Sequence, residues 1–68
     1  MKVTLFPGPD QHENEVAVLI LQDLPEVEIE VAESLLLEGR VILPFIETDE
    51  GERRFGISSI RQFVSNRR

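Results

Sequence analysis

The sequence predicts one small α/β domain with the element order β-α-β-(short α)-β-β-α over all 68 residues. Apolar and polar residues alternate over 2–6 and again over 27–31, which is typical of strands with one covered face. Between these runs, residues 11–24 repeat their apolar side chains at helical spacing. Proline and glycine separate the runs, so strands and helices are expected to follow one another in a single domain.

Local signals mark the first loop and helix. The Pro-Gly-Pro segment at 7–9 breaks the first strand, and Asp10 is a preferred N-cap residue. Glu13 follows three residues later, where it can complete a capping box. The helix should run to Leu24 and end before Pro25, because the residue before a proline disfavours helical backbone. Its core side is expected to consist of Val16, Ala17, Ile20, Leu21 and Leu24.

The middle of the chain predicts a second strand, one turn of helix and a third strand. Glutamates at 26, 28 and 30 alternate with apolar residues, which favours a strand with one solvated face. Ser34 and Gly39 could open and close a single helical turn. Residues 41–47 are apolar on both faces and indicate a central strand. This strand contains Pro44, and a bend at an X-Pro step is one place where a cis peptide bond occurs.

The last third predicts a hairpin and a closing helix. A turn at 48–51 takes its unusual dihedral angles from Gly51, and residues 51–56 form an edge strand. Ser58 or Ser59 is expected to cap the last helix. The core side of that helix is expected to hold Ile60, Phe63 and Val64.

Composition excludes several classes of function. The net charge is −6, and all 13 acidic residues lie in residues 1–52, so a nucleic-acid partner is not expected. No apolar run approaches the length that spans a membrane, and no signal peptide is visible, so we expect a cytoplasmic protein. The chain has no cysteine, which excludes disulfide staples and thiol chemistry.

Other chemistry finds little support in the sequence. The segment HENEV lacks the second histidine of a His-Glu-x-x-His zinc motif, since Val16 stands in its place. A hydrolytic pair of Ser58 and His12 has no acid that could orient the histidine. No metal, no cofactor and no catalytic set is expected, and the chain is predicted not to be an enzyme.

Three segments together resemble the thioredoxin fold in its minimal, glutaredoxin-like form. They are the opening MKVTLFPGPDQHENE, the central VILPFIETDEGERRFGI and the closing SSIRQFV. The resemblance covers nearly the whole chain and implies a four-stranded mixed sheet of order 2-1-3-4. It also implies that the first and last helices cover one face of the sheet and the short middle helix the other. The chain is most similar to small bacterial members in which a histidine follows the first cysteine, as His12 would here.

The resemblance also assigns site residues. The two cysteines of the family's Cys-x-x-Cys motif fall on Gln11 and Asn14, and the family's cis-proline falls on Pro44. Thiol–disulfide exchange requires a thiolate, which neither glutamine nor asparagine can form. What remains is a helix N-terminus beside a proline segment. The resulting vestigial groove is expected to consist of Asp10, Gln11, His12, Asn14, Leu43 and Pro44.

The start of the last helix extends this expected site. Gly56 matches part of the family's turn before that helix, whereas Phe55 replaces a second glycine of the turn. Ser58 and Ser59 stand where glutathione-binding members carry an acidic pair, so glutathione is not expected to be the ligand. Further ligand contacts are expected at Gly56, Ser58 and Ser59.

Two functions remain open from the sequence. The first is a redox-inactive module that binds a peptide or protein through the vestigial groove. The second is a structural or assembly subunit that associates through apolar surface, as a homodimer or with a partner. This alternative arises because one helical turn is too short to cover a whole sheet face, which would leave Phe6, Ile42 and Ile46 on that face partly covered. The favoured interpretation is that the leucines at 35–37 collapse over this face and complete the core. The assembly subunit would instead use that face, or Val18 and Leu19, as its interface.

Overall fold

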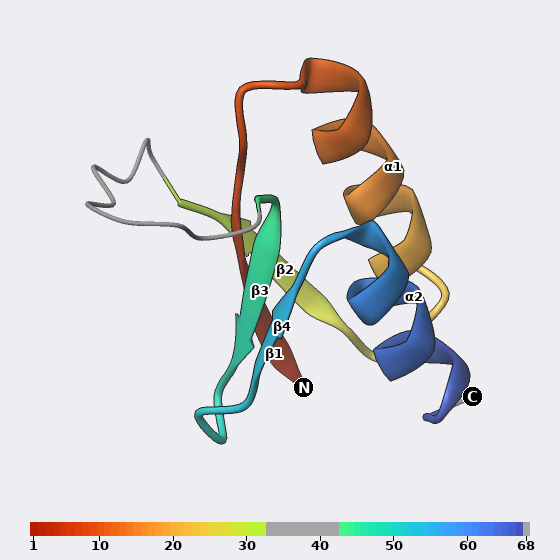
Figure 1. Ribbon diagram of the computed structural model, residues 1–68. Coiled ribbons are helices and arrows are strands. Elements are labelled where there is room, and N and C mark those ends of the chain that lie inside the picture. The colour runs from red at the N-terminus through yellow and green to blue at the C-terminus, as the bar shows by residue number, and fades with distance from the viewer. Residues whose placement is uncertain (33–42, 68) are drawn as a thin grey trace.

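The computed structural model describes residues 1–32 and 43–67 of the chain (Figure 1). The predicted turn at 34–39 and the predicted start of the third strand lie outside the described residues. The described elements are β1 (Lys2–Phe6), α1 (Gln11–Leu21), β2 (Glu28–Val31), β3 (Phe45–Thr48), β4 (Arg53–Phe55) and α2 (Ile57–Ser65).

The strands form one mixed sheet of order β2-β1-β3-β4, as predicted. β1 pairs in parallel with β2, and Val3 lies opposite Ile29. β1 pairs in antiparallel fashion with β3, and β3 in turn with β4. The hairpin between β3 and β4 turns at Gly51, whose φ of 88° is a backbone conformation that favours glycine.

Both described helices lie on the same face of the sheet and pack against each other (Figure 1). Leu5 of β1 and Ile46 of β3 are almost fully buried beneath them. Burial of each such side chain contributes about 1.5–3 kcal/mol, and without cysteine this core carries the stability of the domain. The core consists of Val3, Leu5, Ala17, Leu21, Leu24, Ile46, Ile60, Phe63 and Val64.

Asp10 caps α1 as predicted, but the helix is shorter than expected. The Asp10 carboxylate accepts hydrogen bonds from the backbone N–H groups of His12 at 3.0 Å and Glu13 at 3.3 Å. The α-helix ends at Leu21 rather than Leu24. The backbone N–H of Leu24 then donates to the carbonyl of Leu21 at 3.0 Å, a tighter turn that still buries the Leu24 side chain.

The start of α2 differs from the prediction that Ser58 or Ser59 caps it. Gly56 occupies the N-cap position and, because it has no side chain, supplies no capping hydrogen bond. The helix begins at Ile57, so both serines lie inside its first turn. Gly56 has a φ of 86°, and its backbone N–H donates to the carbonyl of Pro44 at 2.8 Å. This long-range contact sets the helix start, which is why local capping preferences alone misplace it.

Two expectations about the third strand are wrong. The strand begins at Phe45, so Pro44 precedes it rather than lying inside it, as suits a residue that has no N–H to donate. Ile46 does not share a face with Phe6, because its pairing opposite Leu5 places it on the helix side of the sheet, where it is fully buried. Ile42 and the leucines at 35–37 lie outside the described residues, and Phe6 is half-buried.

Three phenylalanines cross the face of the sheet opposite the helices. Phe6 lies opposite Phe45, and Phe45 lies opposite Phe55, in the strand register. Their ring centroids are 4.5 and 4.8 Å apart. Such a row holds three strands together on the side where the main core contributes nothing.

Neither described helix is long and apolar enough to cross a membrane.

Candidate functional site

The loop before α1 lies against the segment before β3. A Cβ atom added to Gly8 would lie 2.7 Å from the Cβ of Leu43 and 3.5 Å from the backbone nitrogen of Pro44. The peptide bond between Leu43 and Pro44 is cis. The absence of a side chain at Gly8 therefore allows the loop to approach the proline segment closely.

Asn14 fixes the shape of this loop from within α1. Its side-chain oxygen Oδ1 accepts a hydrogen bond from the Gly8 N–H at 2.8 Å, and its Nδ2 donates to the Gly8 carbonyl at 2.9 Å. Asn14 as a residue is only 9% exposed, so both bonds replace water that the loop backbone would otherwise need. The family resemblance assigned a cysteine to this position, whereas the asparagine found there is a buried loop anchor.

The proline segment is also tied to α2. Pro44 is buried, and its carbonyl accepts the hydrogen bond from Gly56 described above. The segment is consequently held between Gly8 on one side and the start of α2 on the other. These two contacts bring together the loop before α1, the proline segment and the start of α2, which are distant in sequence.

A groove of about 320 Å³ opens at this point, and we name it the proline groove. Its lining combines apolar surface with a carboxylate and a hydroxyl, and it draws on the first turn of α1, the proline segment, the end of β4 and the start of α2. A groove of this composition suits a short segment that buries an apolar side chain and makes a few polar contacts. The lining residues are Glu13, Leu43, Phe55, Gly56, Ile57 and Ser58.

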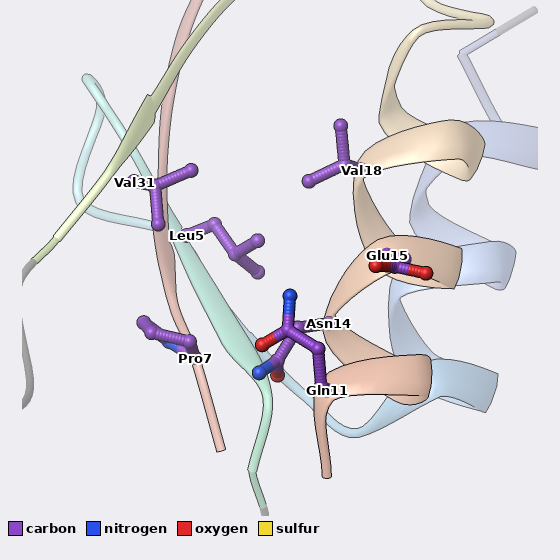
Figure 2. A pocket seen from close by; sticks show the side chains of 7 residues that line it. All are labelled: Leu5, Pro7, Gln11, Asn14, Glu15, Val18 and Val31. Atoms are coloured by element: carbon purple, nitrogen blue, oxygen red, sulfur yellow. The ribbon is translucent and has the colours of Figure 1, made fainter. Parts of the chain in front are cut away.

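A second groove of about 220 Å³, the strand-edge groove, lies between α1 and the edge of the sheet. Figure 2 shows the Leu5 and Val18 side chains pointing toward each other across it, with Gln11 and Asn14 at one end. The groove is mostly apolar. Its lining consists of Leu5, Pro7, Gln11, Asn14, Glu15, Val18 and Val31.

The residues predicted to form a single vestigial groove are thus divided. Leu43, Gly56 and Ser58 line the proline groove, whereas Gln11 and Asn14 line the strand-edge groove. Three further predicted residues line neither groove: Asp10 and His12 are exposed, and Pro44 is buried.

Ser59, the last predicted ligand contact, is half-buried in the first turn of α2 and does not line the proline groove. The prediction missed Glu13, Phe55 and Ile57 as lining residues. Phe55 could have been found from the sequence, because an apolar residue directly before the turn glycine must lie beside the start of the following helix. Glu13 and Ile57 could not have been found in this way. Glu13 was assigned to a capping box, and Ile57 preceded the expected cap of the last helix.

The described residues group no three His, Asp or Glu side chains in a way that could hold a metal ion. No known protein family, curated protein or solved structure matches the chain. The candidate site therefore rests on its own contacts: Asn14 with Gly8, Gly8 with Leu43, and Pro44 with Gly56.

Proposed function

We propose that this chain is a thioredoxin-like domain of the glutaredoxin-like kind that has no thiols and binds an extended peptide or protein segment in the proline groove. The observation that carries the proposal is the Leu43–Pro44 segment, held between Gly8 and the N–H of Gly56. The sheet order β2-β1-β3-β4, with both described helices on one face, supports the same assignment.

The proposed function is binding without redox chemistry. In thiol-bearing relatives, the backbone before the cis-proline receives extended peptide or glutathione, and such strand-like pairing does not depend on sulfur. Here no residue can form a mixed disulfide, because the chain has no cysteine. Asn14 maintains the loop geometry instead, through its two bonds to Gly8.

The lining indicates what the groove would accept. Leu43, Phe55 and Ile57 offer apolar contact, and Phe55 is 40% exposed, so a ligand side chain packed there would remove apolar surface from water. The Glu13 carboxylate at the rim disfavours an acidic side chain next to it and favours a basic or neutral one. An extended segment with an apolar side chain, bound beside Leu43, satisfies these conditions.

A peptide selection with two matched variants tests the proposal. Random dodecapeptides displayed on phage are selected on the folded domain, and the enriched sequences are synthesised and titrated against Ser58→Trp and Gln62→Trp. Ser58 lines the groove, whereas Gln62 is exposed one helical turn further along α2. We expect Ser58→Trp to block binding and Gln62→Trp to leave it unchanged. Equal binding by both variants, or no enrichment at all, would contradict the proposal.

The second candidate is an assembly subunit, and a specific observation favours it. Leu19 on α1 is 66% exposed and Val31 on β2 is 55% exposed, so apolar side chains are present on the surface away from the proline groove. Sedimentation over a range of protein concentrations tests this function. A mass that rises with concentration, and that Leu19→Ser lowers, would support assembly; a constant monomer mass would exclude self-association.

A further inference from the structure

β2 is an edge strand whose outer backbone groups have no strand partner in the described part of the chain. The N–H of Glu28 donates to the carbonyl of Met1 at 2.8 Å, and that of Ala32 donates to Leu5 at 2.9 Å. Backbone groups alternate in direction along a strand, so the N–H and C=O groups of Ile29 and Val31 point away from β1. β2 is the first strand in the sheet order, and these groups form a template for one more strand.

The two faces of this edge differ in chemistry. On the helix side, Ile29 packs against the core, and Val31 reaches the strand-edge groove beside Leu5 (Figure 2). On the other side stand Glu28 and Glu30, both exposed. Successive side chains of a strand point to opposite faces. In a strand added along β2, every second side chain would therefore lie beside apolar groups on the helix side, and the others would lie beside carboxylates on the opposite side.

Charge decides which kind of strand fits. Lys2 forms an ion pair with Glu30 at 3.1 Å, while Glu28 forms none within the described residues. Glu15 adds a further carboxylate at the strand-edge groove. A second copy of β2 would fit poorly, because any pairing that keeps the apolar side chains on one face sets glutamate beside glutamate. A strand with basic residues at these positions would meet opposite charges instead.

We propose that the outer edge of β2 binds an extended peptide segment in which apolar and basic residues alternate. The backbone of the segment pairs with Ile29 and Val31, its basic side chains lie beside Glu28 and Glu30, and an apolar side chain enters the strand-edge groove. This surface is separate from the proline groove and has no lining residue in common with it.

Fluorescence anisotropy with three labelled decapeptides tests this inference. One alternates lysine and valine, the second alternates glutamate and valine, and the third has five lysines followed by five valines. We expect only the first to bind with saturation. Val31→Pro should abolish its binding, because proline removes an outward N–H while leaving the hydrogen bonds to β1 intact. The double variant Glu28→Gln/Glu30→Gln should weaken binding about fivefold and reduce its salt dependence.

Controls separate this surface from general charge attraction and from the proline groove. Glu50→Gln removes one exposed carboxylate on the turn between β3 and β4, and it should leave binding unchanged. Ser58→Trp should also leave it unchanged, so the two proposals fail independently. Equal binding of the third peptide, or undiminished binding by the Glu28→Gln/Glu30→Gln variant, would overturn the inference. Self-association of the free domain that Val31→Pro abolishes would overturn it too, in favour of a second copy.

Discussion

The side chain of Asn14 binds the backbone of Gly8 at both its N–H and its carbonyl, at 2.8 and 2.9 Å. One buried amide thus satisfies a donor and an acceptor of the loop and joins that loop to α1. The same loop residue lies against Leu43, so the position of the proline segment depends on this anchor. The candidate site is therefore maintained by a polar contact at the position where the resemblance would place a reactive sulfur.

We expect Asn14→Ala to destabilise the domain by about 2–3 kcal/mol, because two backbone groups of Gly8 lose their partners. For a domain of this size that is a large part of the free energy of unfolding. Urea denaturation followed by circular dichroism measures the change. Gln11→Ala is the matched control, since Gln11 is exposed on the same turn, and it should cost less than about 0.5 kcal/mol. Equal costs for the two variants would show that Asn14 is not an anchor.

Gly8→Ala tests the close approach of the loop to the proline segment. The new Cβ would lie 2.7 Å from the Leu43 Cβ, so the loop and the segment must separate, at an expected cost of about 1–3 kcal/mol. Gly51→Ala is the contrast, because a Cβ added there has no atom within 4 Å. Its only cost is the unfavourable φ of 88°, about 1 kcal/mol. Amide NMR shifts at residues 43–45 should move in Gly8→Ala and not in Gly51→Ala. Unmoved shifts in both variants would contradict the contact.

Glu52 links the β3–β4 hairpin to the end of α2 and should make stability depend on pH. Desolvation opposes its ionisation, but hydrogen bonds and charge from Arg54 and Arg67 outweigh that effect and hold the pKa of Glu52 below its ordinary value. The stabilisation is therefore present above the unfolded pKa of about 4.5 and is lost as pH falls through the lower folded value. Glu52→Gln should therefore be less stable than wild type at neutral pH, and the difference in stability between the two should disappear in acid.

The control for this prediction is Glu50→Gln on the same turn, since its carboxylate forms no ion pair within the described residues. Melting temperatures across an acid pH series, at low and at high salt, measure the difference. A gap between wild type and Glu52→Gln that stays constant through the acid range would refute the electrostatic role.

Gln11→Cys restores a thiol at the position where the resemblance places the first cysteine. Gln11 is the first residue of α1, where unpaired N–H groups and the helix dipole favour a thiolate. We expect its pKa to be about one unit or more below that of a cysteine in Gln22→Cys, at the other end of the same helix. Thiolate ultraviolet absorbance against pH measures both values. A thiol at Gln11→Cys with the higher pKa would show that the helix end does not favour an anion.

Much of the fold could be predicted because its signals are local. The alternation at 27–31 predicts β2, and the carboxylate of Asp10 marks the start of α1. Sheet order came from the family resemblance rather than from any single residue. The start of α2 could not be predicted, since the bond from Gly56 to Pro44 fixes it across the fold and outweighs two serines with good capping propensity.

The candidate site was predicted in part, for a similar reason. The proximity of the first loop to Pro44 followed from the resemblance, and the Gly8–Leu43 contact agrees with it. The resemblance did not predict that the site is divided into two grooves. That division depends on the direction in which each side chain projects from α1. Asn14 turns toward the loop and the sheet edge, whereas Glu13 reaches the proline groove, although the two are adjacent in sequence.

The most direct test of the central claim is an amide shift map of the isotope-labelled domain, recorded during titration with the peptide selected on it. Peptide binding in the proline groove predicts saturating shifts at Leu43, at residues 55–58 and at Glu13, all lost in Ser58→Trp and retained in Gln62→Trp. Saturating shifts confined to other residues, such as the outer edge of β2 or the exposed side of α1, would contradict it.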